Sequence, residues 1–231
     1  MTIEDFGARV ASVWQGLRPA TRSMVERALS TPAPPQGPAA TTTPSRRESP
    51  YDARSEWELS RLLAALDERA AEVGTTALSA EQSRALRRMT ETCAAVLNRE
   101  ARSSEVFAQL LERALRDKDY ARVDEVADVM SARLAPGELC ETARHLNPAV
   151  RAVAQEALLQ LPTGMLVALL GDPVDAETAR TALETQADEY ESEEARIIVV
   201  SYGAHPGSPG RYTRWSSGPN TATDLSLCST H

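Results

Sequence analysis

The chain has 231 residues, of which 42% are hydrophobic, 25% are charged and only 4% are aromatic, and its formal net charge is −8. This composition favours helices packed through Ala and Leu, because a β-sandwich would need more Val, Ile, Thr and aromatic residues. An acidic chain has no global attraction to nucleic acid or anionic lipid, so we expect neither as a partner.

No segment directs the chain to a membrane or to secretion. The N-terminus lacks the basic and apolar regions of a signal peptide, and the longest apolar run, around residues 165–170, is too short to span a bilayer. Cys93, Cys140 and Cys228 lie far apart and match neither a disulfide framework nor a zinc motif. We therefore expect a cytoplasmic protein with reduced thiols and no membrane span.

Residues 1–30 form the first predicted unit, an amphipathic helix with a break near Pro19. Its apolar positions recur at helical spacing: Ile3, Phe6, Val10, Val13, Trp14 and Leu17. Such a helix either docks on the main core or binds a partner or a membrane surface. Glu4 and Asp5 disfavour an anionic membrane, because helices that lie on lipid prefer Lys and Arg.

Residues 31–55 are rich in Pro, Thr and Ser, and this composition predicts a disordered linker. Pro-rich segments also serve as ligands for aromatic grooves, so a spacer and a ligand are both compatible with the pattern.

Residues 56–198 are expected to form consecutive helices joined by short turns, as in antiparallel helical hairpins. Ser79 and Gln82 have the spacing of a capping box, Asp119 is placed to cap a helix, and Asn147 precedes Pro148 as an N-cap. The periodicity gives helices at 56–73, 79–97, 104–116, 119–134, 138–146, 147–161, 162–170 and 172–183, the last capped by Asp172.

Two surfaces of these helices follow from their spacing. The first helix has an expected inward face of Trp57, Leu59, Leu62, Leu63, Leu66 and Ala70. Cys93 shares an apolar face with its neighbours and is expected to be a small buried hydrophobe. The last helix leads into an acidic surface of Glu184, Asp188, Glu189, Glu191, Glu193 and Glu194.

Residues 199–231 are dominated by Ser, Thr, Gly and Pro without a visible period, which predicts a disordered tail. The composition changes abruptly after Val200. One hypothesis is therefore that the tail is not the natural continuation of the helices, as after a frameshift.

The pattern Asn147-Pro148-x-Val150-Arg151-x-x-Ala154-x-x-Ala157-Leu158-x-x-Leu161 resembles the second helix of a HEAT repeat. Residues 138–146 would be the matching first helix, and a second copy extends to about residue 186, although Asp175 and Ala176 replace its Val-Arg pair. The resemblance implies a short right-handed solenoid of antiparallel hairpins. Proteins of this family most often serve as protein-binding scaffolds.

The sequence contains only weak patterns for metal binding, catalysis or anion binding. Glu141 and His145 are four residues apart and would share one helix face, but too few other ligands exist to predict a metal site. Cys140 and His145 have poor spacing for a catalytic pair. The best basic patch, Arg84, Arg87 and Arg88, is flanked by acids and is typical of a salt-bridged surface. We therefore predict no catalytic, cofactor-binding or metal-binding residues.

The sequence favours a non-enzymatic scaffold or adaptor that binds another protein, with second helices lining any groove and acidic residues attracting a basic segment. Two alternatives remain open. One is a nucleic-acid-binding helical repeat with a continuous Arg stripe, and the other is an accessory subunit or lyase-type repeat with a pocket between hairpins. Self-association through uncovered apolar surface is a further expectation.

Overall fold

The computed structural model describes residues 3–30, 52–72 and 78–203, and all regular structure within these ranges is helical. The protein is therefore all-α, as its composition predicts. Its elements are η1 (Ile3–Phe6), α1 (Ala8–Gly16), α2 (Pro19–Ser30), α3 (Ala53–Ala71), α4 (Ala80–Glu100), α5 (Ser104–Asp117), α6 (Tyr120–Arg133), α7 (Pro136–Thr142), α8 (Pro148–Leu159), α9 (Thr163–Leu169), α10 (Ala176–Asp188) and α11 (Glu193–Gly203).

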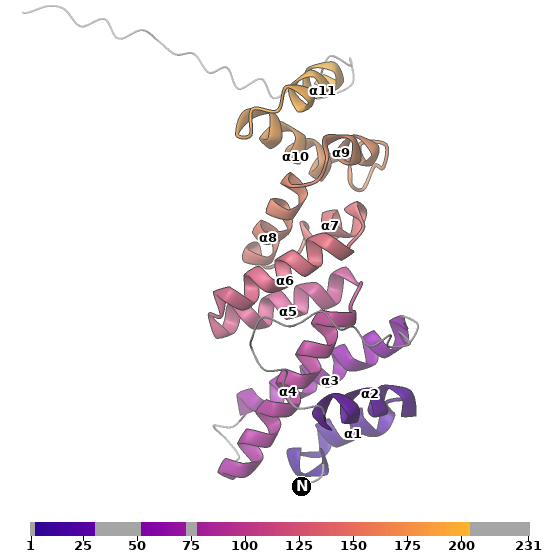
Figure 1. Cartoon of the computed structure of the whole chain (residues 1–231), viewed down its shortest axis with the longest axis vertical. Helices are drawn as coiled ribbons and strands as arrows, with labels where there is room; N and C mark the ends of the chain where they lie inside the picture. Colours follow the sequence, from indigo (N-terminus) through magenta and orange to yellow (C-terminus); the bar gives the residue numbers. More distant parts are fainter. Residues whose placement is uncertain (1–2, 31–51, 73–77, 204–231) are drawn as a thin grey trace, which may run out of the picture.

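The helices succeed one another along the longest axis of the molecule, from α1 at one end to α11 at the other (Figure 1). Each odd-numbered helix from α1 to α11 contacts the next odd-numbered helix, and each even-numbered helix from α2 to α10 contacts the next even-numbered one. Sequential helices also pack together, in the pairs α2–α3, α3–α4, α4–α5, α5–α6, α7–α8, α9–α10 and α10–α11. The chain thus builds two parallel series of contacts, one odd and one even.

Side chains of α4, α6 and α10 bind C-terminal carbonyl groups of the preceding even helix, which would otherwise lack partners. Arg88 of α4 donates to the end of α2 at 2.7 Å, and Arg133 of α6 donates to the end of α4 at 2.9 Å. Gln186 of α10 donates to the carbonyl groups of Leu159 and Leu161, each at 2.9 Å, at the end of α8. The same kind of joint therefore recurs three times along the even series.

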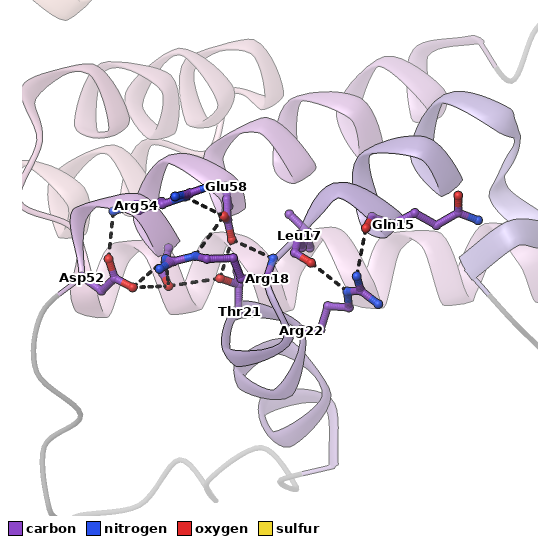
Figure 2. Close-up of polar contacts among 9 residues, drawn as sticks. Gln15, Leu17, Arg18, Thr21, Arg22, Asp52, Arg54 and Glu58 are labelled. Carbon is purple, nitrogen blue, oxygen red and sulfur yellow. Dashed lines mark hydrogen bonds and ion pairs between the residues drawn. The ribbon is translucent and has the colours of Figure 1, made fainter.

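The buried carboxylate of Glu58 on α3 holds the N-terminal end of α2 (Figure 2). It accepts hydrogen bonds from the Arg18 backbone N–H at 3.1 Å, the Arg18 Nε at 3.0 Å and the Thr21 hydroxyl at 2.6 Å. Asp52 pairs with the same guanidinium at 2.6 Å. Helices α1 and α2 therefore dock on α3 and α4, as one of the two interpretations of residues 1–30 expects.

The apolar core runs through all the helices. Its largest fully buried side chains are Phe107, Leu59, Leu62, Leu63, Leu66, Leu97, Leu111, Met130, Leu139, Leu158, Leu166 and Leu183. Trp57 and Ala70 are exceptions to the predicted inward face. Trp57 is 53% exposed, with the Arg61 guanidinium 4.7 Å from its ring centroid, and Ala70 is exposed near the end of α3. Residues two apart on a helix point in different directions, so Trp57 cannot share the face of Leu59.

Three predicted caps are confirmed. Ser79 and Gln82 form the capping box of α4, Asp119 accepts a hydrogen bond from the Arg122 backbone N–H, and Asn147 accepts one from the Ala149 N–H. These side chains satisfy amide groups at the helix starts that have no partner within the helix.

The predicted cap at Asp172 is only partly right. Its carboxylate accepts a hydrogen bond from the Val174 N–H at 2.8 Å, but α10 begins at Ala176 rather than at Pro173. Residues 173–175 form a turn in which the buried Asp175 carboxylate pairs with Arg144 at 2.7 Å. This ion pair fixes the turn that precedes α10, and the helix begins after it, at Ala176.

Other boundaries also differ from expectation. Helix α3 begins at Ala53, inside the predicted linker. Helix α7 ends at Thr142, so His145 lies in the connection between α7 and α8 and not on a helix. Helix α11 covers residues 199–203, which the sequence assigned to a disordered tail. The remaining linker and tail predictions, for 31–51 and 204–231, lie outside the described residues.

No single helix in the described ranges is long and apolar enough to cross a membrane, although the bent pair α8 and α9 meets that test of length and composition jointly.

Candidate functional site

Glu141 and His145, which the sequence was expected to place on one helix face, have separate partners in the structure. The carboxylate of Glu141 accepts a hydrogen bond from the Ser104 hydroxyl at 2.7 Å, whereas the Nδ1 of His145 lies 4.0 Å from Glu112. In the described part of the chain, no three His, Cys, Asp or Glu side chains gather as metal ligands. Glu141 thus joins α7 to α5, and the His145 Nδ1 accepts a hydrogen bond from the nearby Asn147 backbone N–H at 3.2 Å.

Cys93 and Cys140 are both buried, with no exposed surface. Burial, assisted by the negative charge of Asp67, raises the pKa of Cys93 to about 12. Burial also raises the pKa of Cys140 to about 11. Since the thiolate is the reactive form of cysteine, neither thiol is suited to nucleophilic chemistry. Cys228 lies outside the described residues.

The predicted basic patch on α4 is exposed, but one member has a structural role. Arg88 binds the end of α2, while Arg84 and Arg87 make no ion pair with any residue that the structure describes. Glu91, which was expected to flank the patch, pairs instead with Arg113 and Arg122. The patch is therefore a short basic area of two side chains and not a stripe that continues across helix pairs.

A hollow of about 200 Å³ lies between the start of α1 and the end of α3. Its charged lining is internally paired, because Arg9 binds Glu68 at 2.7 Å and Arg69 binds Glu72 at 3.4 Å. The Arg69 Nε is buried without a hydrogen-bond partner, yet the lining carries no surplus of either charge. The arrangement does not gather the nucleophile and base that a catalytic pocket needs.

Exposed acidic side chains lie on three helices of the even series. They lie on α6, α8 and α10, at Asp124, Asp128, Glu156, Glu184 and Asp188. None of these five forms an ion pair with another described residue; the Glu156 carboxylate accepts a hydrogen bond from the Tyr190 hydroxyl at 3.3 Å. Their charge is therefore not neutralised within the described structure.

Helix α11 presents apolar side chains to solvent at the end of this acidic stretch. Ile197 is 59% exposed and Val200 is 67% exposed; they lie three residues apart and so share one face. On the opposite face, Ala195 is fully buried and Val199 packs against the core. Among the described helices α11 packs mainly against α10 and also against α9, and the face that carries Ile197 and Val200 is exposed.

We define the α11 surface as the exposed apolar residues Tyr190, Ile197, Val200 and Tyr202 together with the acids Asp188, Glu189, Glu191 and Glu194. All eight residues are exposed. The negative charge of Glu156, followed by partial burial, raises the pKa of Tyr190. The nearby Arg196 is already engaged, with Glu193 at 2.7 Å and with the Ala187 carbonyl at 3.3 Å.

The α11 surface thus carries both exposed apolar side chains and exposed acids. Of its residues, the sequence predicted Asp188, Glu189, Glu191 and Glu194 as an acidic surface, but it missed the apolar ones entirely. The run Ile197 to Val200 is apolar at four successive positions, so its helical face could not be identified from periodicity.

Comparison of the chain with protein-family models, with curated proteins and with solved structures finds no match.

Proposed function

We propose that this protein is a short α-solenoid that serves as a scaffold, binding another protein through the α11 surface. The two series of helix contacts and the recurrent joints at the ends of even helices support a solenoid, in which each unit contacts only its neighbours. The observation that carries the binding role is the exposed apolar face of Ile197 and Val200 beside unpaired acids. HEAT-like antiparallel hairpins are part of this proposal.

The proposed partner segment is an amphipathic helix with an apolar stripe and basic flanks. Another helix is the natural cover for the outer face of α11, because every earlier odd helix from α3 to α9 packs between two odd neighbours. Lys or Arg beside its stripe would complement Glu189, Glu191 and Glu194. Ile197 and Val200 would supply the apolar contact, since a buried side chain of this size contributes about 1.5–3 kcal/mol.

Nucleic-acid binding has less support than protein binding. It requires phosphate contacts from several Lys or Arg side chains along one surface. On the even series, Arg88 and Arg133 bind helix ends, and Arg122 pairs with Glu91 and Glu125. The other exposed charged residues on α6, α8 and α10 are all acidic.

The test is fluorescence anisotropy with the full-length protein and a fluorescein-labelled synthetic amphipathic helix built from Leu and Lys. A matched peptide built from Leu and Glu controls for apolar binding without charge complementarity. We expect the Leu/Lys peptide to bind and the Leu/Glu peptide not to bind. We also expect affinity to fall as salt is added, because the acids of the α11 surface are exposed.

Two double variants locate the binding. I197S/V200S should weaken binding by about tenfold or more, corresponding to about 1.4 kcal/mol of lost apolar contact. E189K/E194K should weaken it most at low salt. The matched control E81K/D124K makes the same charge change at exposed acids on α4 and α6 and should leave binding within about twofold.

Three outcomes would contradict parts of the proposal. If both peptides bind equally, the partner does not need a basic segment. If all three double variants lose the same amount of affinity, the binding is general charge attraction. The third outcome is self-association, which sedimentation velocity detects. A concentration-dependent dimer that I197S/V200S abolishes would assign the α11 surface to contact with a second copy of the chain.

A further inference from the structure

The α11 surface ends where residues 204–231 begin. Glu194, Ile197 and Val200 follow one another at intervals of three residues, so they share one face of α11. All three side chains are exposed. The helix ends at Gly203, so the chain leaves α11 at one end of this face. The residues that follow are therefore the part of the sequence that is tethered closest to the proposed binding surface.

The sequence after α11 is complementary to this surface in charge and in side-chain type. We call Arg211-Tyr212-Thr213-Arg214-Trp215 the basic–aromatic segment, and it contains every Arg and every aromatic residue after Tyr202. Residues 204–223 include no Asp or Glu, whereas residues 184–194 include acids and no Lys or Arg. The segment thus offers the basic and apolar side chains that a partner of the α11 surface needs.

The connection between α11 and the basic–aromatic segment is long enough to bring the two together. Its seven residues, 204–210, can span at most about 23–25 Å. Helix α11 has 11 residues, and at a rise of about 1.5 Å per residue it is about 16 Å long. The connection also contains the pairs Pro206-Gly207 and Pro209-Gly210, a pattern typical of turns that reverse the chain. The segment can therefore reach any part of α11.

We propose that the basic–aromatic segment binds the α11 surface of its own chain and competes there with the partner helix. This competition rests on the binding role proposed above. The two arginines pair with the acids of the surface, and the two aromatic side chains cover Ile197 and Val200. A short connection holds the segment at an effective concentration of about a millimolar, well above that of a second copy of the chain in dilute solution. A weak contact is therefore enough to occupy the surface until a tighter partner arrives.

Methyl nuclear magnetic resonance on the full-length protein tests the contact without any partner. The methyl signals of Ile197 and Val200 should shift in Y212S/W215S, because aromatic rings change the resonance frequency of methyl groups beside them. The same signals should shift in R211S/R214S, because the segment loses its ion pairs. The methyl signals of Leu146, which is 92% exposed in the connection between α7 and α8, are a reference that should not move in either variant.

The matched control for charge is R84S/R87S. It removes the same two positive charges as R211S/R214S, but from exposed arginines on α4 that make no ion pair within the described structure. These substitutions should leave the signals of Ile197 and Val200 in place.

Fluorescence anisotropy with the Leu/Lys peptide tests the competition. Both segment variants should bind the peptide about threefold or more tightly than the unmodified protein, because apparent affinity is reduced by the fraction of molecules whose surface is free. R84S/R87S should stay within about twofold of the unmodified protein, because its charge change lies far from the peptide and is screened by salt. Y212S/W215S changes no charge, so its tighter binding cannot come from general electrostatic attraction.

The contact and the binding role can fail separately. Unchanged signals of Ile197 and Val200 in both segment variants would overturn the contact, whether or not the peptide binds. Equal tightening in R211S/R214S and R84S/R87S would overturn it too, and so would shifts that disappear on dilution, which would assign the segment to a second copy. If the signals shift but no variant binds the peptide, the contact stands and the proposed partner is wrong. If the peptide binds every variant equally, the binding role stands and the competition is wrong.

Discussion

Replacement of Glu58 by Ala tests whether the joint between α2 and α3 stabilises the fold. The side chain of Glu58 is 5% exposed, and its loss leaves the Arg18 backbone N–H and the buried Thr21 hydroxyl without their acceptor. Each buried donor without a partner costs about 1–3 kcal/mol. Thr21 retains Ser55 at 3.0 Å, and Arg18 retains Asp52, so we expect the lower part of the summed range, about 2 kcal/mol.

Glu68 on the same helix provides the matched control. Its ion pair with Arg9 joins α3 to α1, but the two side chains are 46% and 69% exposed. An exposed pair of this kind contributes about 0–1 kcal/mol, so E68A should have little effect. Urea unfolding followed by far-ultraviolet circular dichroism measures both variants. If E58A costs no more than E68A, the Glu58 joint does not stabilise the fold as argued.

Two further predictions concern pH and thiol reactivity. Burial acts to raise the pKa of Glu58, but the hydrogen bonds from Thr21 and Arg18 outweigh burial and lower that pKa below 4.5. The contribution of Glu58 to the free energy of unfolding is therefore complete above pH 4.5 and is lost as the pH falls through the folded-state pKa. E58Q should therefore show a shallower loss of the free energy of unfolding in acid, measured by urea titration; parallel curves for both proteins would contradict this. In a C228S variant, Cys93 and Cys140 should react with Ellman's reagent only after urea unfolds the chain, because both pKa values are raised by burial; rapid labelling of the native protein would refute the assignment.

Local signals in the sequence predicted the helices well, because capping chemistry depends on a few adjacent residues. Ser79 and Asn147 each sit beside the amides that they cap, so their role is visible from spacing alone. The joints between helices are different. Arg88 looked like a member of a basic patch, and only the fold brings it to the end of α2, 59 positions away in sequence.

The sequence predicted the acidic part of the α11 surface but not its apolar part, because the apolar part depends on contacts between distant residues. Acidic residues such as Glu189 and Glu194 are exposed almost wherever they occur, so their placement follows from composition. Ile197 points outward and Ile198 inward because of the helices that α11 contacts. Those contacts follow from the tertiary fold and not from the local sequence. Long-range packing therefore decides the apolar part of the surface, which periodicity could not supply.

The recurrent joints bear on how the proposed surface would work. A side chain that binds carbonyl groups at the end of a neighbouring helix accepts only a narrow range of positions, since hydrogen bonds weaken steeply with distance and angle. Gln186 joins α10 to α8 in this way, and Arg196 joins α11 to the end of α10. The exposed face of Ile197 and Val200 is thereby held in place by both polar joints and the buried Ala195. A partner helix would then meet a preformed face, and its binding would cost little ordering of this chain.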